Sequence, residues 1–254
     1  MSALIDRHQY ILDKIKTEGS VHVLDLCQAL NVSSVTIRKD LKLLEEKDLL
    51  FRTHGGAKAG NPYTADRPVN EKAKIKSDEK FDIGEAAARL IVPNDCILIA
   101  SGTTVLSLAK NIRPEGNLTV ITAALNVALE LSRHSEIEII QLGGILRKSS
   151  TSVTGVYAEK ILEDFSFSKL FLGVDGIDMD FGLTTSNMME AQLNRKMIAA
   201  SQQTIVLADS SKFGKRGFGK ICGIEEIEHI ITDSGISDHM VDTLKSMGIE
   251  VTIV

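Results

Sequence analysis

Four residues that carry either a hydroxyl group or no side chain follow an apolar segment of the sequence. Residues 96–100 are typical of a buried strand, and Ser101, Gly102, Thr103 and Thr104 come where that strand gives way to a helix. A glycine lets an anion approach closely, hydroxyls donate hydrogen bonds to it, and a helix N-terminus adds free N–H groups and the positive end of its dipole. The segment lacks the Lys-Ser or Lys-Thr pair of a Walker loop. It predicts a phosphate site, with an ordinary capped helix start as the alternative.

Charged residues near other predicted strand ends indicate the same kind of ligand. Arg147, Asp175 and Lys212 each follow a predicted strand, and Glu190 lies on a predicted helix. The carboxyl ends of strands in an open α/β sheet converge on one crevice, so we expect these residues to share a ligand, with Lys212 at a phosphate and Asp175 at sugar hydroxyls. Turn closure is the alternative for Asp175, and a solvated helix face for Glu190. The predicted effector-binding residues are Ser101, Gly102, Thr103, Thr104, Arg147, Asp175, Glu190 and Lys212.

A second polar set lies near the N-terminus, on a helix predicted to start at Ser33 or Ser34. Ile37, Leu41 and Leu44 share the inner face of this helix, which leaves hydroxyls and cations on the outer faces. Such residues near the start of a second helix after a tight turn are used in major-groove docking, although surface cations are also ordinary. The predicted strand that follows, with a glycine pair at its tip, could track a phosphate backbone. The predicted DNA-binding residues are Ser34, Thr36, Arg38, Lys39, Lys42, Arg52, His54, Gly55 and Gly56.

The elements that must position the second set lie in residues 1–58. Apolar residues recur at helical spacing around Ile11 and Ile15 and again over 23–30, and 49–54 reads as a short strand that ends at a pair of glycines. The pattern predicts three helices and a β-wing. This segment carries nine Lys or Arg and eight Asp or Glu, whereas the whole chain has a net charge of −5. A nucleic-acid partner is therefore indicated by local placement of charge and not by a global basic field.

The elements that must position the first set begin after a predicted linker at 59–72, which contains glycine and proline and no apolar period. In residues 73–254, apolar strands alternate with helical segments such as 105–111, 125–133 and 189–201. This alternation predicts a mostly parallel α/β sheet covered on both faces. The predicted strands are 96–100, 118–122, 137–142, 169–174, 204–208, 229–232 and 250–254.

Two segments of the first 58 residues resemble a known signature. Arg7, Ile11 and Ile15 recur at a four-residue spacing, and residues 33–41 read Ser-Ser-Val-Thr-Ile-Arg-Lys-Asp-Leu. Together they resemble the helix-turn-helix of the DeoR family of bacterial transcriptional regulators. Residues 52–57, Arg-Thr-His-Gly-Gly-Ala, look like the wing of that family.

The rest of the chain resembles the DeoR sensor domain, with FLGVDGID at 171–178, GLTT at 182–185 and DSSKFG at 209–214 in the order of the family. That domain is related in fold to ribose-5-phosphate isomerase, so the resemblance implies such a fold and a phosphorylated sugar or sugar-like effector. Ala100 stands where many relatives have aspartate, and residues 123–124 are both alanine where Asn-Ser is frequent. These departures remove polar groups from the expected crevice.

Composition excludes several classes of protein. The 254 residues are 43% apolar and 25% charged, which is close to the globular average and argues against a disordered chain. The three cysteines are far apart and lack CxxC spacing, so we expect neither a disulfide framework nor a metal site, and we predict no cofactor. No apolar run approaches the ~18 residues of a membrane span, so we expect no membrane partner and a cytoplasmic location.

Three functions remain to be weighed. A sugar-phosphate isomerase needs a base near the substrate, and related isomerases place a lysine shortly after the acidic turn, where this chain has Gly-Leu-Thr-Thr-Ser at 182–186. A structural DNA-binding protein would rarely carry a large acidic α/β domain. We therefore predict a regulator and not an enzyme: a repressor of a carbohydrate catabolic operon that binds double-stranded operator DNA and a phosphorylated sugar. One winged module makes few contacts, so a dimer or tetramer is expected.

Overall fold

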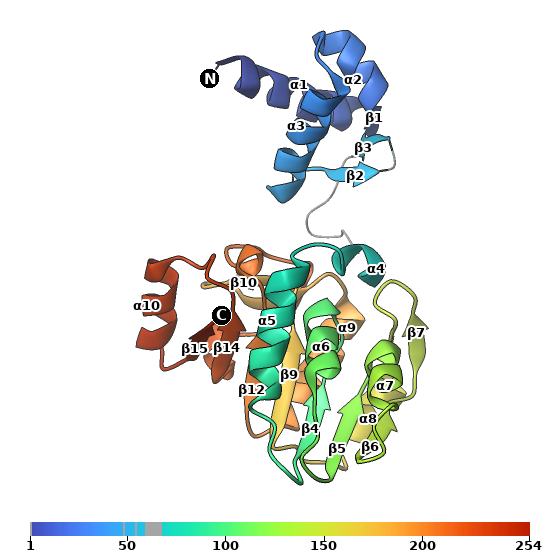
Figure 1. Cartoon of the computed structure of the whole chain (residues 1–254), viewed down its shortest axis with the longest axis vertical. Helices are drawn as coiled ribbons and strands as arrows, with labels where there is room; N and C mark the ends of the chain where they lie inside the picture. The colour runs from blue at the N-terminus through green and yellow to red at the C-terminus, as the bar shows by residue number, and fades with distance from the viewer. Residues whose placement is uncertain (1, 48, 54, 59–67) are drawn as a thin grey trace. The chain divides into compact units, whose positions relative to one another are not determined.

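The computed structural model describes residues 2–47, 49–53, 55–58 and 68–254. The chain divides into two compact units, Met1–Ala65 and Asp66–Val254 (Figure 1). The predicted fold class, a winged helix-turn-helix followed by a mostly parallel α/β domain, is confirmed. No helix in the described part of the chain is long and apolar enough to cross a bilayer.

The first unit consists of three helices and a small antiparallel sheet. Ile11, Leu26, Ile37 and Leu41 are at most 1% exposed and form its core. Ser33 caps the third helix as predicted, because its side chain accepts a hydrogen bond from the Thr36 N–H. The elements are α1 (Ser2–Glu18), β1 (Ser20–His22), α2 (Val23–Leu30), α3 (Ser34–Glu46), β2 (Phe51–Thr53) and β3 (Gly56–Lys58).

The sequence predicts a single short strand at 49–54, whereas the wing sheet in the described residues has three strands. The strand order is β1-β3-β2, and β1 pairs with β3 in the register Val21 to Ala57 and His22 to Gly56. Gly56 is buried, and a Cβ at this position would lie 2.0 Å from the Val21 carbonyl oxygen. Only glycine lets the two strands approach this closely, so Gly56 has a structural role in the wing.

The second unit is built on seven parallel strands in the order β15-β14-β12-β9-β4-β5-β6. All seven strands were predicted from their apolar runs. The chain extends the sheet from β4 toward β6 and then returns to place β9 on the other side of β4, so the order reverses between β4 and β9. The strands are β4 (Cys96–Ile99), β5 (Leu118–Thr122), β6 (Ile137–Gln141), β9 (Lys169–Gly173), β12 (Thr204–Leu207), β14 (His229–Thr232) and β15 (Glu250–Ile253).

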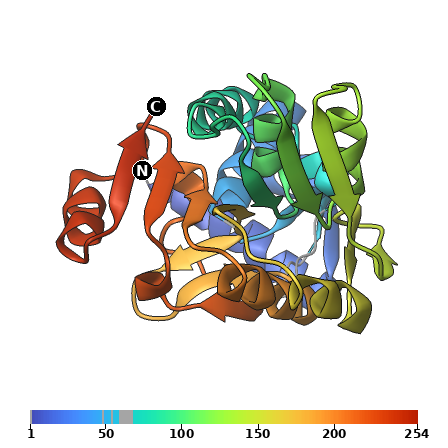
Figure 2. The ribbon, with the colours of Figure 1, turned by 90° about the horizontal axis from the view of Figure 1, so that it is seen from below.

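Helices cover both faces of this sheet (Figure 2). Alternate strand residues point to opposite faces: Ile97 and Ile99 pack in one apolar cluster, and Leu98 packs in the other. The first cluster includes α5 (Ser77–Ala88), α6 (Thr103–Asn111) and α7 (Leu125–Leu131). The second includes α8 (Val156–Leu162), α9 (Met188–Ala199) and α10 (Asp238–Ser246).

Several short elements that the sequence did not predict surround the strand ends. They are the sheet of β10 (Gly176–Asp178), β11 (Gly182–Thr185) and β13 (Gly219–Cys222), the hairpin of β7 (Ile145–Arg147) and β8 (Ser152–Thr154), and the 3-10 turns Ser210–Lys212 and Ile224–Glu226. β10 begins three residues after the end of β9, and the turn at Ser210 begins three residues after the end of β12. These elements therefore build the surroundings of the carboxyl edge of the large sheet.

The predicted linker 59–72 differs from the structure at its end. Residues 59–67 lie outside the described residues, but Val69–Lys72 forms a helical turn, α4, which belongs to the second unit. The Val69 N–H donates to the Ser149 carbonyl oxygen at 2.7 Å, and Val69 is only 7% exposed. The sequence of residues 59–72 has the composition of a linker and gave no sign of this turn, because the contacts that stabilise the turn are with residues distant in sequence.

Candidate DNA-binding face and effector site

A buried carboxylate fixes α3 against α1. Asp40 is 2% exposed and accepts hydrogen bonds from Arg7 Nε at 2.5 Å, Arg7 Nη2 at 2.9 Å and His8 Nε2 at 3.2 Å. Burial by itself would raise the pKa of Asp40, but the hydrogen bonds from Arg7 and His8 hold it below its ordinary value. Sequence reasoning assigned Asp40 no role, although a charged residue between the inward-facing Ile37 and Leu41 was a signal for one.

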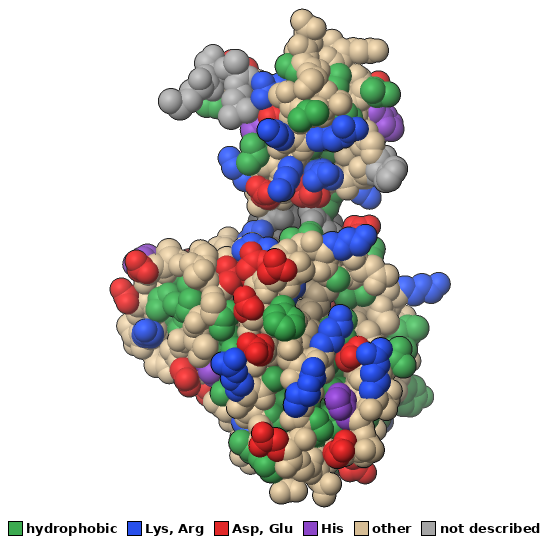
Figure 3. Space-filling view, viewed as in Figure 1, with side chains coloured by type: hydrophobic (Ala, Val, Ile, Leu, Met, Phe, Trp, Pro, Cys, Tyr) green, Lys and Arg blue, Asp and Glu red, His purple; other side chains and the backbone are tan. Residues whose placement is uncertain are grey.

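The opposite face of α3 carries the predicted cations. Arg38, Lys39 and Lys42 are exposed, and Ser34 and Thr36 are half-buried near the start of the helix. Arg38 Nη1 donates to Ser34 Oγ at 3.3 Å, and Lys42 Nζ forms an exposed ion pair with Glu46 at 3.8 Å within α3. Lys and Arg side chains gather on the face of this unit that Figure 3 presents. The arrangement offers hydroxyls at the helix start and cations along one surface.

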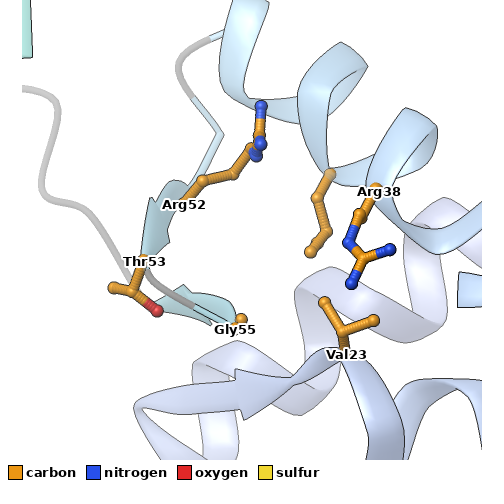
Figure 4. Close-up of a pocket in the computed structure, with 7 residues that line it drawn as sticks. Val23, Arg38, Arg52, Thr53 and Gly55 are labelled. Atoms are coloured by element: carbon orange, nitrogen blue, oxygen red, sulfur yellow. The ribbon is translucent and has the colours of Figure 1, made fainter. Parts of the chain in front are cut away.

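The wing and α3 border an open hollow of about 340 Å³. Figure 4 shows Arg38 from α3 and Arg52 from β2 on two sides of it. The Arg52 N–H donates to Glu45 Oε1 at 3.0 Å, which ties the wing to the end of α3. Gly55, with φ of 96°, lies at the exposed tip, and the predicted contact His54 lies outside the described residues. The remaining lining residues are Val23, Leu41, Thr53 and Gly56.

The hydroxyl loop lies at the carboxyl end of β4, beside the point where the strand order reverses. Gly102, with φ of 137°, is the N-cap residue of α6, and no side chain caps the first N–H groups of this helix. Among the described residues, the hydroxyls of Ser101, Thr103 and Thr104 have no hydrogen-bond partner. A Cβ on Gly173 at the end of β9 would lie 3.0 Å from the Ser101 carbonyl oxygen, so this glycine gives the loop its room. The loop keeps its donors available to a ligand.

Asp175 lies just beyond the end of β9 and accepts hydrogen bonds from three groups. Lys72 Nζ lies 2.7 Å from Oδ1, whereas the Ser186 N–H at 3.0 Å and Thr185 Oγ1 at 3.3 Å donate to Oδ2. Burial would raise the pKa of Asp175, but the charges of Lys72 and Lys212 hold it well below its ordinary value. The side chain remains 25% exposed and is therefore an anionic acceptor at this edge.

Arg147 and Glu190 form an ion pair connected to Asp175. Arg147 Nη1 lies 2.9 Å from Glu190 Oε2, and Ser152 Oγ donates to Glu190 Oε1 at 3.3 Å. Thr185 Oγ1 lies 3.3 Å from both Glu190 Oε2 and Asp175 Oδ2, so it links the two carboxylates. Glu190 is 8% exposed, which differs from the solvated helix face considered above. Its oxygens are used inside the protein, where they hold Arg147 in place.

Lys212 is a half-buried cation in the turn that follows β12. Its ammonium group makes no hydrogen bond or ion pair with any residue of the described ranges, but it is close enough to Asp175 to lower the pKa of that carboxyl. β12 and β4 are the two neighbours of β9 in the sheet. The strand order therefore places Lys212 and the loop that begins at Ser101 on either side of the end of β9.

Sequence reasoning missed two lysines at this edge, Lys72 and Lys80. Lys80, on α5, is 6% exposed and donates to the carbonyl oxygens of Lys72 at 2.7 Å and Ile75 at 2.6 Å. Burial lowers the pKa of Lys80 to about 8. Its place on an otherwise ordinary helix gave no signal, because its acceptors are backbone atoms. Within the described ranges, no cluster of three or more His, Cys, Asp or Glu side chains could hold a metal ion.

A winged helix with exposed cations, followed by a parallel α/β domain, defines a DNA-binding regulator with a sensor domain. Family models agree with this class: residues 7–62 match the DeoR-like helix-turn-helix domain, and residues 75–234 match the DeoR C terminal sensor domain. The chain belongs to the DeoR family of transcriptional regulators. It is thus a regulator and not an enzyme, which confirms the choice made against an isomerase.

Relatives are similar over nearly the whole chain. The putative aga operon transcriptional repressor of Escherichia coli O157:H7 is 36% identical over 98% of this chain and 93% of its own length. The HTH-type transcriptional regulator YulB of Bacillus subtilis is also 36% identical, over 98% of this chain and 96% of its own. Among solved structures, ribose 5-phosphate isomerase A from Methanocaldococcus jannaschii shares 14% identity over 54% of each chain, with a TM-score of 0.40.

Proposed function

We propose that this regulator represses a carbohydrate catabolic operon and that a phosphorylated sugar, bound at the carboxyl edge of the sheet, controls it. The observation that carries the proposal is the pairing of an unused hydroxyl loop with an unpaired cation. Within the part of the chain that the structure describes, Ser101, Thr103 and Thr104 have no hydrogen-bond acceptor for their hydroxyls. Gly102 leaves the loop open, and Lys212 lies across the end of β9. Hydroxyls, helix N–H groups and an ammonium group together are suited to a phosphate dianion.

The sugar part of the effector would lie toward Asp175 and Arg147. A partly exposed carboxylate accepts hydrogen bonds from sugar hydroxyls, and the guanidinium of Arg147, held by Glu190, donates them. Ala100 and Ala123 are 0% and 2% exposed and contribute no polar side chains near the ends of β4 and β5. The polar contacts to the sugar would therefore come from the β9 and β7 side of the crevice.

On the DNA side, we propose that α3 enters the major groove and that the wing follows the backbone of a double-stranded operator. Ser34, Thr36, Arg38, Lys39 and Lys42 would act from α3, with Arg52, His54 and Gly55 from the wing. Gly56 would act through the shape of the wing, because it is buried. A dimer or tetramer would present two such units to the half-sites of one operator.

A thermal-shift titration of the full chain tests the effector proposal. At ~100 times its dissociation constant, a ligand of the folded state adds about 2.7 kcal/mol of stability, which raises the melting temperature by several degrees. We expect a sugar phosphate in a panel with matched free sugars to give this shift, and the free sugars not to. Lys212→Ala should need at least ~10-fold more ligand.

The matched control is Lys245→Ala, which removes an exposed lysine of α10 and should leave the titration unchanged. Two results would contradict the proposal. One is equal stabilisation by the free sugar and its phosphate, and the other is wild-type affinity in Lys212→Ala.

A further inference from the structure

The helical turn α4 connects the effector edge to the chain segment that leads from the DNA-binding unit. α4 begins at Val69, three residues after the boundary between the two units at Asp66. Two attachments hold its backbone to the sensor: Val69 N–H to Ser149 O at 2.7 Å, and Lys80 Nζ to Lys72 O at 2.7 Å. The third attachment is the side chain of Lys72, which reaches Asp175.

The two oxygens of Asp175 have different partners. Oδ2 accepts from the Ser186 N–H and from Thr185, two groups of the sensor itself. Oδ1 accepts only from Lys72 among the described residues. A sugar hydroxyl that donates to Oδ1 would therefore meet the Lys72 ammonium at the same atom. Both side chains are about one quarter exposed, so the pair is accessible to such a competitor.

We propose that Lys72 belongs to the effector site as the internal cation that occupies Asp175 when no effector is bound, and that the effector displaces it. Displacement removes the Lys72 attachment of α4 and leaves its two backbone attachments and the buried Val69 side chain. The N-terminal end of α4, which continues from the segment 59–67, is then held less tightly on the sensor. The inference rests on the proposed function, because it assigns a regulatory contact to the same site.

Lys80 limits the response to the start of α4. Lys80 is 6% exposed, and its ammonium group donates to the carbonyl oxygens of Lys72 and Ile75, so the chain beyond Lys72 stays attached to α5. Residues 68–71 lie before this fixed point and depend on Val69 and Lys72 for their docking. Amides of α4 should therefore report the state of the Lys72 to Asp175 pair.

The first test needs no ligand. Hydrogen exchange in the full chain compares wild type with Lys72→Met, which keeps the length of the side chain and removes its charge. The matched control is Lys74→Met, because Lys74 is exposed and its side chain has no hydrogen bond or ion pair within the described ranges. We expect α4 amides to exchange ~10-fold faster in Lys72→Met and unchanged in Lys74→Met. Equal exchange in all three proteins would overturn the inference.

The second test separates displacement from a purely structural role. Binding of glucose 6-phosphate, ribose 5-phosphate and inorganic phosphate is titrated by calorimetry. A sugar phosphate that binds wild type should bind Lys72→Met ~10-fold more tightly, because its hydroxyl no longer competes with an internal cation, whereas inorganic phosphate, which has no sugar hydroxyl, should not gain affinity. Weaker binding would make Lys72 a direct ligand and would overturn displacement. The double variant Lys72→Met/Asp175→Asn removes both charges of the pair. Its α4 amides should also exchange faster than in wild type, which would show that an unpaired Asp175 carboxylate is not the cause of the faster exchange in Lys72→Met.

The third test uses an operator selected from random-sequence DNA by the wild-type chain. Without effector, the operator affinity of Lys72→Met should shift in the direction that effector shifts wild type, and Lys74→Met should not shift. An unchanged operator affinity despite faster exchange of the α4 amides would overturn the inference that the docking of α4 controls DNA binding. If no sugar phosphate binds wild type, the proposed function fails, whereas the exchange and operator measurements still decide whether Lys72 controls α4.

Discussion

Replacement of Asp40 by alanine should destabilise the DNA-binding unit far more than an ordinary surface change. The side chain of Asp40 is 3% exposed, and its carboxylate accepts two hydrogen bonds from Arg7 and one from His8. Removal of one partner of a fully buried ion pair costs ~3–5 kcal/mol. Arg7 is 18% exposed and regains some hydration, so we expect a loss of ~2–3 kcal/mol.

Such a loss is a large share of the stability of a unit this small. In chemical denaturation of full-length Asp40→Ala, the first unit should unfold at a lower denaturant concentration than in wild type, and the sensor should unfold at the same concentration. Calorimetry of the two proteins should show the same separation. The matched control is Asp25→Ala, which removes an exposed carboxylate of α2 and should cost less than ~1 kcal/mol. Equal unfolding free energies for Asp40→Ala and Asp25→Ala would refute the proposed role of the buried pair.

The same pair gives the first unit a pH dependence of known sign. The folded-state pKa of Asp40 lies below its ordinary value, so its contribution is fully present above ~4, the unfolded value, and is lost as pH falls through the folded value. Wild type should therefore lose stability in this acid range. Asp40→Asn should lose less over the same interval, and identical acid profiles would contradict the assignment.

Three further predictions concern single residues. Gly56→Ala should lower the melting temperature of the first unit, because its Cβ would lie 2.0 Å from the Val21 carbonyl oxygen; an unchanged circular-dichroism melt would contradict this. Arg38→Ala should weaken operator binding by ~1–3 kcal/mol in a fluorescence titration at fixed salt while the melt stays unchanged; unchanged affinity would remove Arg38 from the DNA contacts. Burial lowers the pKa of Lys80 to about 8, so the folded protein loses the buried charge at lower pH than the unfolded chain does. Wild type should therefore gain stability relative to Lys80→Met as pH rises from about 8 toward the ordinary lysine value, while the neutral amine still donates to its two carbonyl oxygens. A constant difference in stability across that interval would contradict the burial of the charge. Asp209, Glu79, Lys72 and Lys212 are the charged groups that act on Lys80 in that interval.

The large sheet could be predicted because its five inner strands, β14, β12, β9, β4 and β5, are mostly buried and centre on apolar residues. The edge strands β6 and β15 are partly exposed but still contain apolar residues, so all seven were visible without knowledge of their neighbours. The antiparallel strands at 176–178, 182–185 and 219–222 are three or four residues long and contain glycine, so they gave no periodic signal. Their structure depends on pairing across the chain, as in the contact of Thr184 with Lys220.

The candidate site was predicted where it depends on strand ends and missed where it depends on tertiary contacts. Ser101, Asp175 and Lys212 follow parallel strands, so the topology of an open α/β sheet brings them to one edge. Lys72 reaches Asp175 across 103 positions of sequence, and no local pattern indicates such a pair. Glu190 was expected on a helix face, and its burial follows from the ion pair with Arg147 on a hairpin that the sequence did not predict.

The most direct test of the account is an operator-binding titration of wild type and Lys212→Ala against increasing sugar phosphate at fixed salt. The central claim is that a sugar phosphate bound at the loop of Ser101–Thr104 and at Lys212 controls DNA binding. We predict that both proteins bind the operator equally well without effector, and that Lys212→Ala needs at least ~10-fold more effector for the same change in DNA affinity. A response of Lys212→Ala at the wild-type effector concentration would contradict the claim.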